Sequence, residues 1–142
     1  MTALSADKVN RSTAGDSYGK SQPVAASTTI YQGALCAFNA SGFIVAATDA
    51  ASLAFAGIAA EYCDNSSGSN GDDSVVIQRG HIERIPHTDL VQADVGKNVV
   101  IEDSNSVTDA AGATNDLKAG TLLGFEDGDA LVHVAVFAAL EA

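Results

Sequence analysis

Tryptophan is absent from this sequence of 142 residues, and proline, methionine and cysteine are rare, with two, one and two copies. Phe and Tyr make up only 6% of the chain, although 46% of it is hydrophobic. The chain is therefore long enough and apolar enough to fold as one domain with a core. Its apolar surface comes in small pieces, which suits closely packed backbones better than a wide ligand pocket.

Basic residues are scarce as well, because seven Lys and Arg stand against 18 Asp and Glu, for a net charge of −11. A field of this sign repels phosphate backbones, so nucleic acid is excluded as a direct partner of the body. The charge is uneven: the first 22 residues hold three basic and two acidic residues, for +1, and the remaining 120 hold four and 16, for −12.

Long apolar runs are also missing: no stretch approaches a membrane span, and no signal-peptide core follows Met1. We therefore expect a protein made and kept in a cytosol, without a membrane partner. In that compartment Cys36 and Cys63 are expected to be reduced, buried thiols and not a disulfide.

Short β-prone runs separated by Gly, Asn, Asp and Ser follow Pro23, which predicts an all-β sandwich or barrel. The expected strands lie within residues 28–38, 42–47, 53–63, 74–85, 97–103, 120–126 and 130–138. Gly42 and the pair Asp127 and Gly128 are suited to close two hairpins. Residues 104–120 are expected to form a loop or a short edge strand.

Helix is expected to be scarce. The one candidate is a single turn within residues 88–96, where Asp89 can cap the first turn and Gln92 follows three residues later. Residues 1–22 show neither hydrophobic period, so we expect an extended N-terminal arm at 1–22 and a β-domain at 23–142.

The last expected strand is apolar on both sides. Alternation divides its side chains into two faces, one with Val132, Val134 and Val136 and the other with Leu131, His133, Ala135 and Phe137. Such a strand is either central in a sandwich or covered by another chain, and we favour the second alternative.

Residues 15–21, GDSYGKS, resemble a phosphate-binding loop, with Gly19, Lys20 and Ser21 in place. The glycines are one residue too close, and Gln22 and Pro23 follow where a helix should begin. The loop at residues 64–73, DNSSGSNGDD, is rich in oxygen ligands, but its carboxylates do not alternate as an EF-hand requires. We interpret it as a solvated hairpin loop.

The run HIERIPH places His81, Glu83 and His87 on one face of a strand. The two histidines would lie about 20 Å apart at roughly 3.3 Å per residue, which is too far to share a zinc ion. The H-x-E spacing lacks the P-C-x-x-C of zinc deaminases. Pairing Cys63 with a histidine rests on residue types alone. We therefore expect no enzyme, no metal and no cofactor, and Arg79 and Arg84 are expected to pair with acidic neighbours.

The order of four phrases carries a resemblance: IYQGALCAFNASGF from Ile30, FAGIAAEYCDNSSG from Phe55, VVIQRGHI from Val75 and ADVGKNVVI from Ala93. Together they resemble the capsid decoration, or cement, proteins of tailed bacteriophages over roughly residues 22–137. The resemblance implies a small β-barrel or β-tulip-like domain on the outer surface of a virion. It implies that this domain binds the assembled major capsid protein as a symmetric oligomer and stiffens the shell against DNA pressure.

Within this hypothesis, the basic arm docks on an acidic capsid surface, and apolar strands join the subunits because the acidic faces repel. The expected capsid-binding residues are Lys8, Arg11, Tyr18 and Lys20. The expected oligomer contacts are Leu53, Phe55, Leu131, Val134 and Phe137, with a trimer favoured over a dimer. Two alternatives stay open, namely an outward-facing adhesion module that binds glycans or a cell surface, and a small metal-dependent enzyme.

Overall fold

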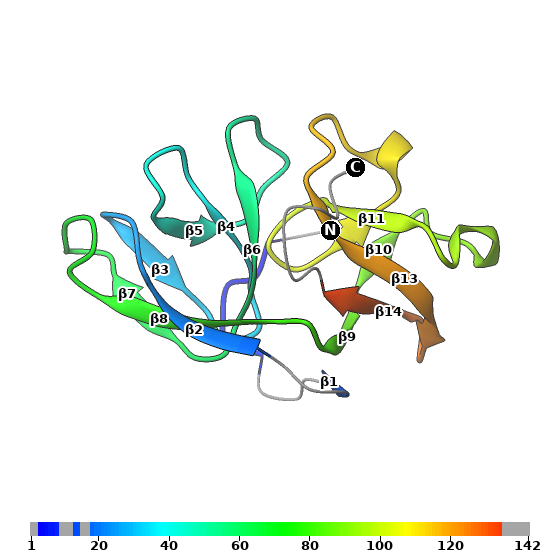
Figure 1. Cartoon of the computed structure of the whole chain (residues 1–142), viewed down its shortest axis with the longest axis horizontal. Helices are drawn as coiled ribbons and strands as arrows, with labels where there is room; N and C mark the ends of the chain where they lie inside the picture. The colour runs from blue at the N-terminus through cyan, green and yellow to red at the C-terminus, as the bar shows by residue number, and fades with distance from the viewer. Residues whose placement is uncertain (1–2, 9–12, 15–17, 135–142) are drawn as a thin grey trace.

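The computed structural model describes residues 3–8, 13–14 and 18–134 of the chain. Their regular structure consists of strands and two short 3₁₀ turns, so the predicted all-β class is confirmed. Figure 1 shows two larger sheets side by side, with a smaller pair of strands at one end. In the described part of the chain, no helix is long and apolar enough to cross a membrane.

The seven-stranded sheet has the order β1-β9-β14-β13-β11-β12-β10. Its strands are β1 (Thr13–Ala14), β9 (Ile82–Ile85), β14 (Asp129–Val134), β13 (Lys118–Glu126), β11 (Asn98–Ile101), β12 (Val107–Thr108) and β10 (His87–Thr88). Neighbours are antiparallel except β10 and β12, which are parallel. The short strand β12 is thus inside the sheet, whereas sequence analysis expected a loop or an edge strand.

The five-stranded sheet has the order β2-β8-β6-β4-β5, and β3 pairs with β7 in a separate two-stranded sheet. Their bounds are β2 (Tyr18–Pro23), β3 (Thr28–Ile30), β4 (Leu35–Phe38), β5 (Ile44–Ala46), β6 (Ala54–Ala59), β7 (Cys63–Asn65) and β8 (Ser74–Arg79). Among the described residues no sheet closes on itself, so the expected barrel is replaced by open sheets. The terminal strands β1 and β10 have two residues each and lie at opposite ends of the seven-stranded sheet.

Both predicted hairpins form with the predicted turn residues. Asp127 and Gly128 have φ of 52° and 85°, and Glu126 pairs with Asp129, which is a two-residue loop of the type that matches strand twist. Gly42 has φ of 86° between β4 and β5.

The core extends across both large sheets. One cluster of buried side chains includes Leu35 and Ile58 from the five-stranded sheet and Val99, Leu122 and Val132 from the seven-stranded sheet. A second cluster lies between the five-stranded sheet and the β3–β7 pair. Because the first cluster joins the two large sheets, the seven-stranded sheet depends on the five-stranded sheet for its buried core.

The predicted helical turn exists, but its cap is different. At the 3₁₀ turn η1 (Gln92–Asp94) the side chain of Asp94 caps the first turn, because its Oδ2 accepts from the backbone N–H of Val91 at 2.9 Å. Asp89 has φ of 65° and lies before the turn, so it does not cap it. A second turn, η2 (Ala110–Gly112), is capped by Asp109, which accepts from the Gly112 N–H at 2.8 Å.

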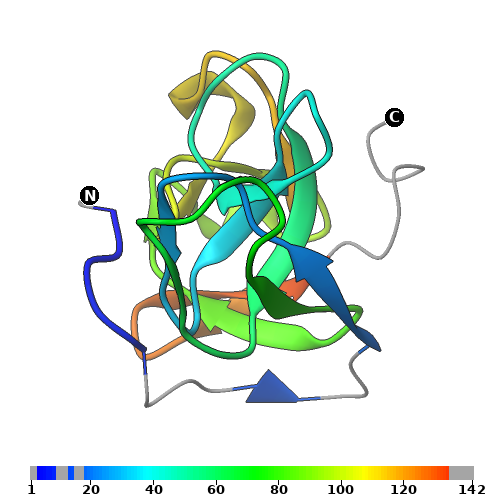
Figure 2. The same ribbon diagram turned by 90° about the vertical axis from the view of Figure 1, so that its left-hand side faces the viewer.

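The N-terminal region lies against the body. We define the N-terminal strap as residues 3–8, 13–14 and 18–23, which lie along the outside of the sheets in Figure 2. β1 pairs with β9 and β2 pairs with β8. The boundary predicted between residues 22 and 23 therefore falls inside β2. The sequence does not mark this strand, because an edge strand held by backbone hydrogen bonds needs no hydrophobic alternation.

Strand β14 lies inside the seven-stranded sheet, between β9 and β13. Val132 and Val134 are 0% and 1% exposed and belong to the shared core. The chain's own five-stranded sheet therefore covers this face, as a central strand of a sandwich requires, and a contact with a second chain stays a prediction for the opposite face only. On the opposite face Leu131 is half-buried and His133 is exposed.

Two glycines of β13 provide a matched test of this packing. A Cβ at Gly120 would collide with the His133 carbonyl on β14, whereas a Cβ at Gly124 would meet no atom within 4 Å. We expect Gly120→Ala to lower the free energy of unfolding by about 1–3 kcal/mol, since paired backbones cannot separate cheaply. Gly124→Ala should change it by no more than about 0.5 kcal/mol. Urea unfolding measures both, and equal effects would contradict the register.

Candidate functional site

The chemistry-bearing side chains gather where β8 leaves the five-stranded sheet and continues as β9. Gly80 separates the two strands with φ of 89°. Its N–H donates to the Val134 carbonyl at 3.1 Å, and the Val134 N–H donates to the His81 carbonyl at 2.8 Å. We call Gly80 and His81 the sheet junction.

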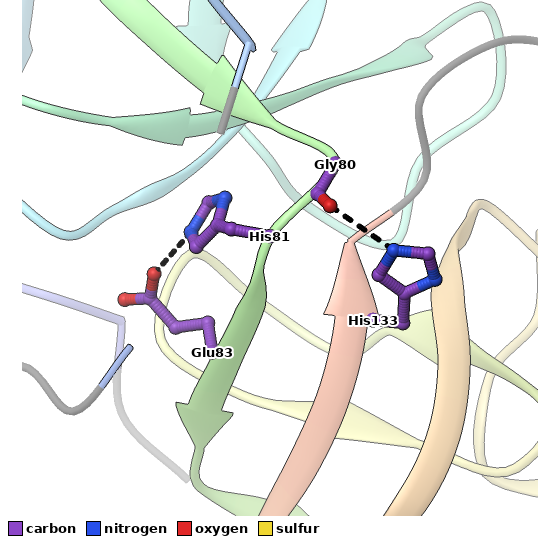
Figure 3. A network of polar contacts seen from close by, with 4 residues as sticks. All are labelled: Gly80, His81, Glu83 and His133. Atoms are coloured by element: carbon purple, nitrogen blue, oxygen red, sulfur yellow. Dashed lines mark hydrogen bonds and ion pairs between the residues drawn. The ribbon is translucent and has the colours of Figure 1, made fainter. Parts of the chain in front are cut away.

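A buried histidine and a buried glutamate meet at this junction. His81 Nε2 lies 2.6 Å from Glu83 Oε1, and the two side chains are 3% and 1% exposed. Figure 3 shows the two side chains turned toward each other on the same side of β9. Alternation along the strand brings residues 81 and 83 to one face, as sequence analysis predicted. Buried ionisable groups need such partners.

On the other side of the junction, His133 Nε2 lies 3.0 Å from the Gly80 carbonyl oxygen (Figure 3). A carbonyl only accepts, so Nε2 carries the proton in this contact. The third histidine is elsewhere: His87 is in β10, where its ring centroid is 5.2 Å from that of Phe125. Among the described residues, no three His, Cys, Asp or Glu side chains are grouped to hold a metal ion.

The acidic loop of residues 64–73 is bonded to itself. Asp64 Oδ1 accepts from the Ser66 N–H at 3.0 Å and the Ser66 hydroxyl at 2.6 Å, which lowers the pKa of Asp64. Asp72 Oδ2 accepts from the Ser69 N–H at 2.8 Å. The loop is exposed as expected, but it joins two different sheets and closes no hairpin, because β7 pairs with β3.

A buried asparagine anchors this loop. Asn65 Nδ2 donates to the carbonyls of Val24, Ala25 and Ser69 at 3.3, 2.9 and 3.0 Å. Its Oδ1 faces Gly68, where a Cβ would collide with it. Asn65 therefore joins the loop to residues 24 and 25, which follow β2.

Both cysteines are free and buried, as predicted. Burial raises the pKa of Cys36 to about 12. Burial, followed by the charge of Asp73, also raises the pKa of Cys63. Thiols held in this state are poor nucleophiles, because the thiolate is the reactive form. Gly19, Lys20 and Ser21, which match part of a phosphate-binding loop in sequence, lie in strand β2. They open no helix, so they form no phosphate-binding site.

The strap touches the body at several points besides its strands. The Leu4 N–H donates to Ser104 Oγ at 3.1 Å, and the Lys8 N–H donates to the Gln32 carbonyl at 2.8 Å. The Gln32 N–H donates in return to Asp7 Oδ1 at 2.9 Å. The backbone of the strap is thus held beside both large sheets.

The predicted capsid-binding residues are dispersed along the strap. Lys20 is exposed on β2, and Lys8 is half-buried near Gln32. Tyr18 begins β2, where its backbone pairs with Arg79. Arg11 lies outside the described residues.

The predicted oligomer residues are only partly on the surface. Leu53 and Phe55 are half-buried against the shared core, and Leu131 is half-buried on the opposite face of β14. Val134 is a core residue and is closed to any partner. Phe137 lies outside the described residues.

Among the described residues, the structure exposes four large apolar side chains that no sequence pattern marked. These are Tyr62 at 49%, Val91 at 58%, Val95 at 37% and Leu123 at 46%. Val91 and Val95 flank η1, and Leu123 is the extra residue of a β-bulge in β13. No sequence signal marks a bulge within an apolar strand, so alternation alone could not have found Leu123.

Comparison with protein-family models, with curated proteins and with solved structures finds no match for this chain.

The buried pair can be tested through stability. Glu83→Ala would leave the buried His81 without its carboxylate, and we expect the free energy of unfolding to fall by about 3 kcal/mol or more. The control is Arg84→Gln on the same strand, where Arg84 Nη1 lies 3.1 Å from Asp127, whose side chain is 82% exposed. That change should cost about 0–1 kcal/mol. Urea unfolding of both variants is the measurement, and similar losses would refute the pair's importance.

Proposed function

We propose that this chain is a structural virion protein that binds the outer surface of the assembled major capsid shell of a tailed bacteriophage. In this proposal it acts as a symmetric oligomer, has no catalytic role and stabilises the shell against internal DNA pressure. The resemblance of the four sequence phrases to capsid decoration proteins supports it, and the all-β fold is compatible with it.

The observation that carries the proposal is the place of the strap. It supplies the terminal strand of both large sheets, since β1 ends one and β2 ends the other. In the described part of the chain, no strand pairs with the outer edge of β2. A sheet edge of this kind can accept an extended strand from another protein, with backbone hydrogen bonds supplying affinity.

The charge distribution favours the same surface for docking. The first 22 residues carry +1 and the remaining 120 carry −12, so an acidic partner is repelled less by the strap than by the rest of the chain. Lys20 lies on β2 with an exposed side chain, beside the open edge. The approach of an acidic capsid surface is thereby directed to this edge.

Selective binding to the assembled shell is enough to stabilise it, because a ligand stabilises the state that it binds. A protein that binds the assembled shell but not its separated subunits stabilises the shell, by about 2.7 kcal/mol per site when its concentration is a hundred times the dissociation constant. An oligomer that places several such edges on neighbouring subunits adds avidity without new contacts.

A charge reversal on the open edge tests this proposal. We expect Lys20→Glu to weaken binding to empty expanded heads roughly tenfold at low salt, and to reduce the salt dependence, because a rim charge sets long-range attraction. Lys97→Glu is the control, since Lys97 is 69% exposed and precedes β11, a strand of the other large sheet. Cosedimentation with heads measures both. Equal affinities for the two variants would contradict docking through β2.

One observation favours the second candidate, an outward-facing glycan-binding module. Tyr62 is 49% exposed, and its ring centroid is 5.9 Å from that of Tyr31. Partial desolvation and the nearby Asp64 charge raise the pKa of Tyr62. An exposed aromatic ring bordered by carboxylates is suited to stacking on a sugar.

Tyr62→Ala separates the two candidates. The cement proposal predicts unchanged affinity for heads, because Tyr62 follows β6 and lies outside the strap. It also predicts that calorimetric titration of the wild-type protein with saccharides gives no saturable heat. Saturable heat that Tyr62→Ala abolishes would establish the glycan-binding candidate in its place.

A further inference from the structure

The seven-stranded sheet has one face in the core and one face outside, and the outside face is apolar at its centre. Val132 and Leu122 point into the core and are 0% exposed. The alternate residues form what we call the outer face, and the strand register brings them together. Its central residues are Ile82, Thr121, Leu123, Leu131 and His133.

The register shows that these residues are neighbours on three adjacent strands. His133 of β14 pairs with Ile82 of β9 on one side and with Thr121 of β13 on the other. Leu131 pairs with Gly124 across the same β13–β14 ladder. Paired residues have their side chains on one face of a sheet. The outer face is therefore continuous across β9, β14 and β13.

A β-bulge raises the apolar content of this face. Leu122 pairs with Val132, and the next pair is Gly124 with Leu131, so Leu123 is the extra residue. The bulge leaves Leu123 46% exposed. Next to it, a Cβ at Gly124 would meet no atom within 4 Å, so the surface in front of Leu131 is open. A protein that exposes a large apolar side chain beside an open glycine has room there for another surface.

Charge determines which partner fits. The central residues of the outer face include no acidic side chain. At its hairpin end Arg84 contacts two carboxylates, since Nη1 lies 3.1 Å from Asp127 and Nε lies 3.4 Å from Asp129. Exposed Glu126 lies opposite Asp129 at the same end, so the carboxylates of this face gather there and not at its centre. The body as a whole carries −12, so two copies repel each other over most of their surfaces. The centre of the outer face is therefore a place where two copies can meet without opposing carboxylates.

We infer that the outer face is a self-association surface, on which the same face of a second copy packs about a two-fold axis. This inference names the contact behind the self-association in the proposed function, and it rests on that part of the proposal. Sheet faces pack about 10 Å apart, with side chains of both faces interdigitating. A two-fold contact is isologous, so Leu123 and Leu131 of each copy meet the same patch of the other.

The proposed contact differs from the set of oligomer residues predicted from the sequence. Leu131 stays in the interface, Leu123 and Ile82 join it, and Val134 leaves it because its side chain is in the core. An isologous contact also produces a dimer, whereas sequence analysis favoured a trimer. Residues 135–142 follow β14 directly in the sequence, so their covering of this face is the competing outcome.

The test is the mass of the free full-length protein, measured by light scattering and by sedimentation over a range of concentrations. The wild-type chain is expected to give twice the chain mass. Gly124→Glu adds a charge where the chain has open space, so the fold should tolerate it. This variant and Leu123→Glu should give the mass of one chain or weaken the dimer at least about tenfold, because like charges then face each other across the axis.

Ser67→Glu is the matched control, because it adds the same charge at an exposed residue of the 64–73 loop, and it should remain a dimer. Urea unfolding checks that all three variants are folded. A wild-type protein of single-chain mass at every concentration would overturn the inference. That mass is the result expected if residues 135–142 cover the face. A Gly124→Glu protein that dimerises like the wild type would also overturn it. Neither outcome involves capsids, so binding to heads is judged separately.

Discussion

The passage of the chain from one large sheet to the other at Gly80 and His81 is the constraint on which the rest of the structure depends. β8 ends at Arg79 in the five-stranded sheet and β9 begins at Ile82 in the seven-stranded sheet. Hydrogen bonds from the Val134 backbone and from His133 hold the junction on one side, and the buried His81 and Glu83 pair lies on the other. The strap follows the same course, since β2 lies on β8 and β1 lies on β9. Both sheets can therefore share one core only while this junction keeps its shape.

Local features of the fold were predictable, because the residues that encode them are adjacent in sequence. The Asp127 and Gly128 turn needs two positive φ angles, and these residues supply them at low cost. The short β-prone runs predicted the all-β class for the same reason. The facing of His81 and Glu83 followed from alternation within a single strand.

Features that depend on distant partners were not predictable. Residues 18–23 carry no hydrophobic alternation, and they form a strand only because β8 offers its edge. Val134 was assigned to an intersubunit contact, since alternation shows that a face is apolar but not which surface covers it. The helix cap was placed at Asp89, because spacing cannot reveal the φ of 65° that excludes it from capping. The exposure of Leu123 depends on a bulge set by the pairing of two strands.

The strap and the outer face are two separate regions on the surface of an acidic protein, and each is suited to a different partner. The strap has an open edge with Lys20 beside it, which fits an extended acidic partner. The outer face is apolar and lacks unpaired carboxylates at its centre, which fits a second copy. The proposed docking and the proposed self-association do not compete for one surface, because β2 and the outer face belong to different sheets.

Imaging of heads by electron microscopy, with and without added protein, tests the central claim most directly. The account predicts that expanded heads of a tailed phage bind the protein and show regular density on their outside, repeated with the symmetry of the shell. It also predicts that this density fits the two sheets with β2 nearest the shell. Heads whose outer surface is identical with and without the protein would contradict the account.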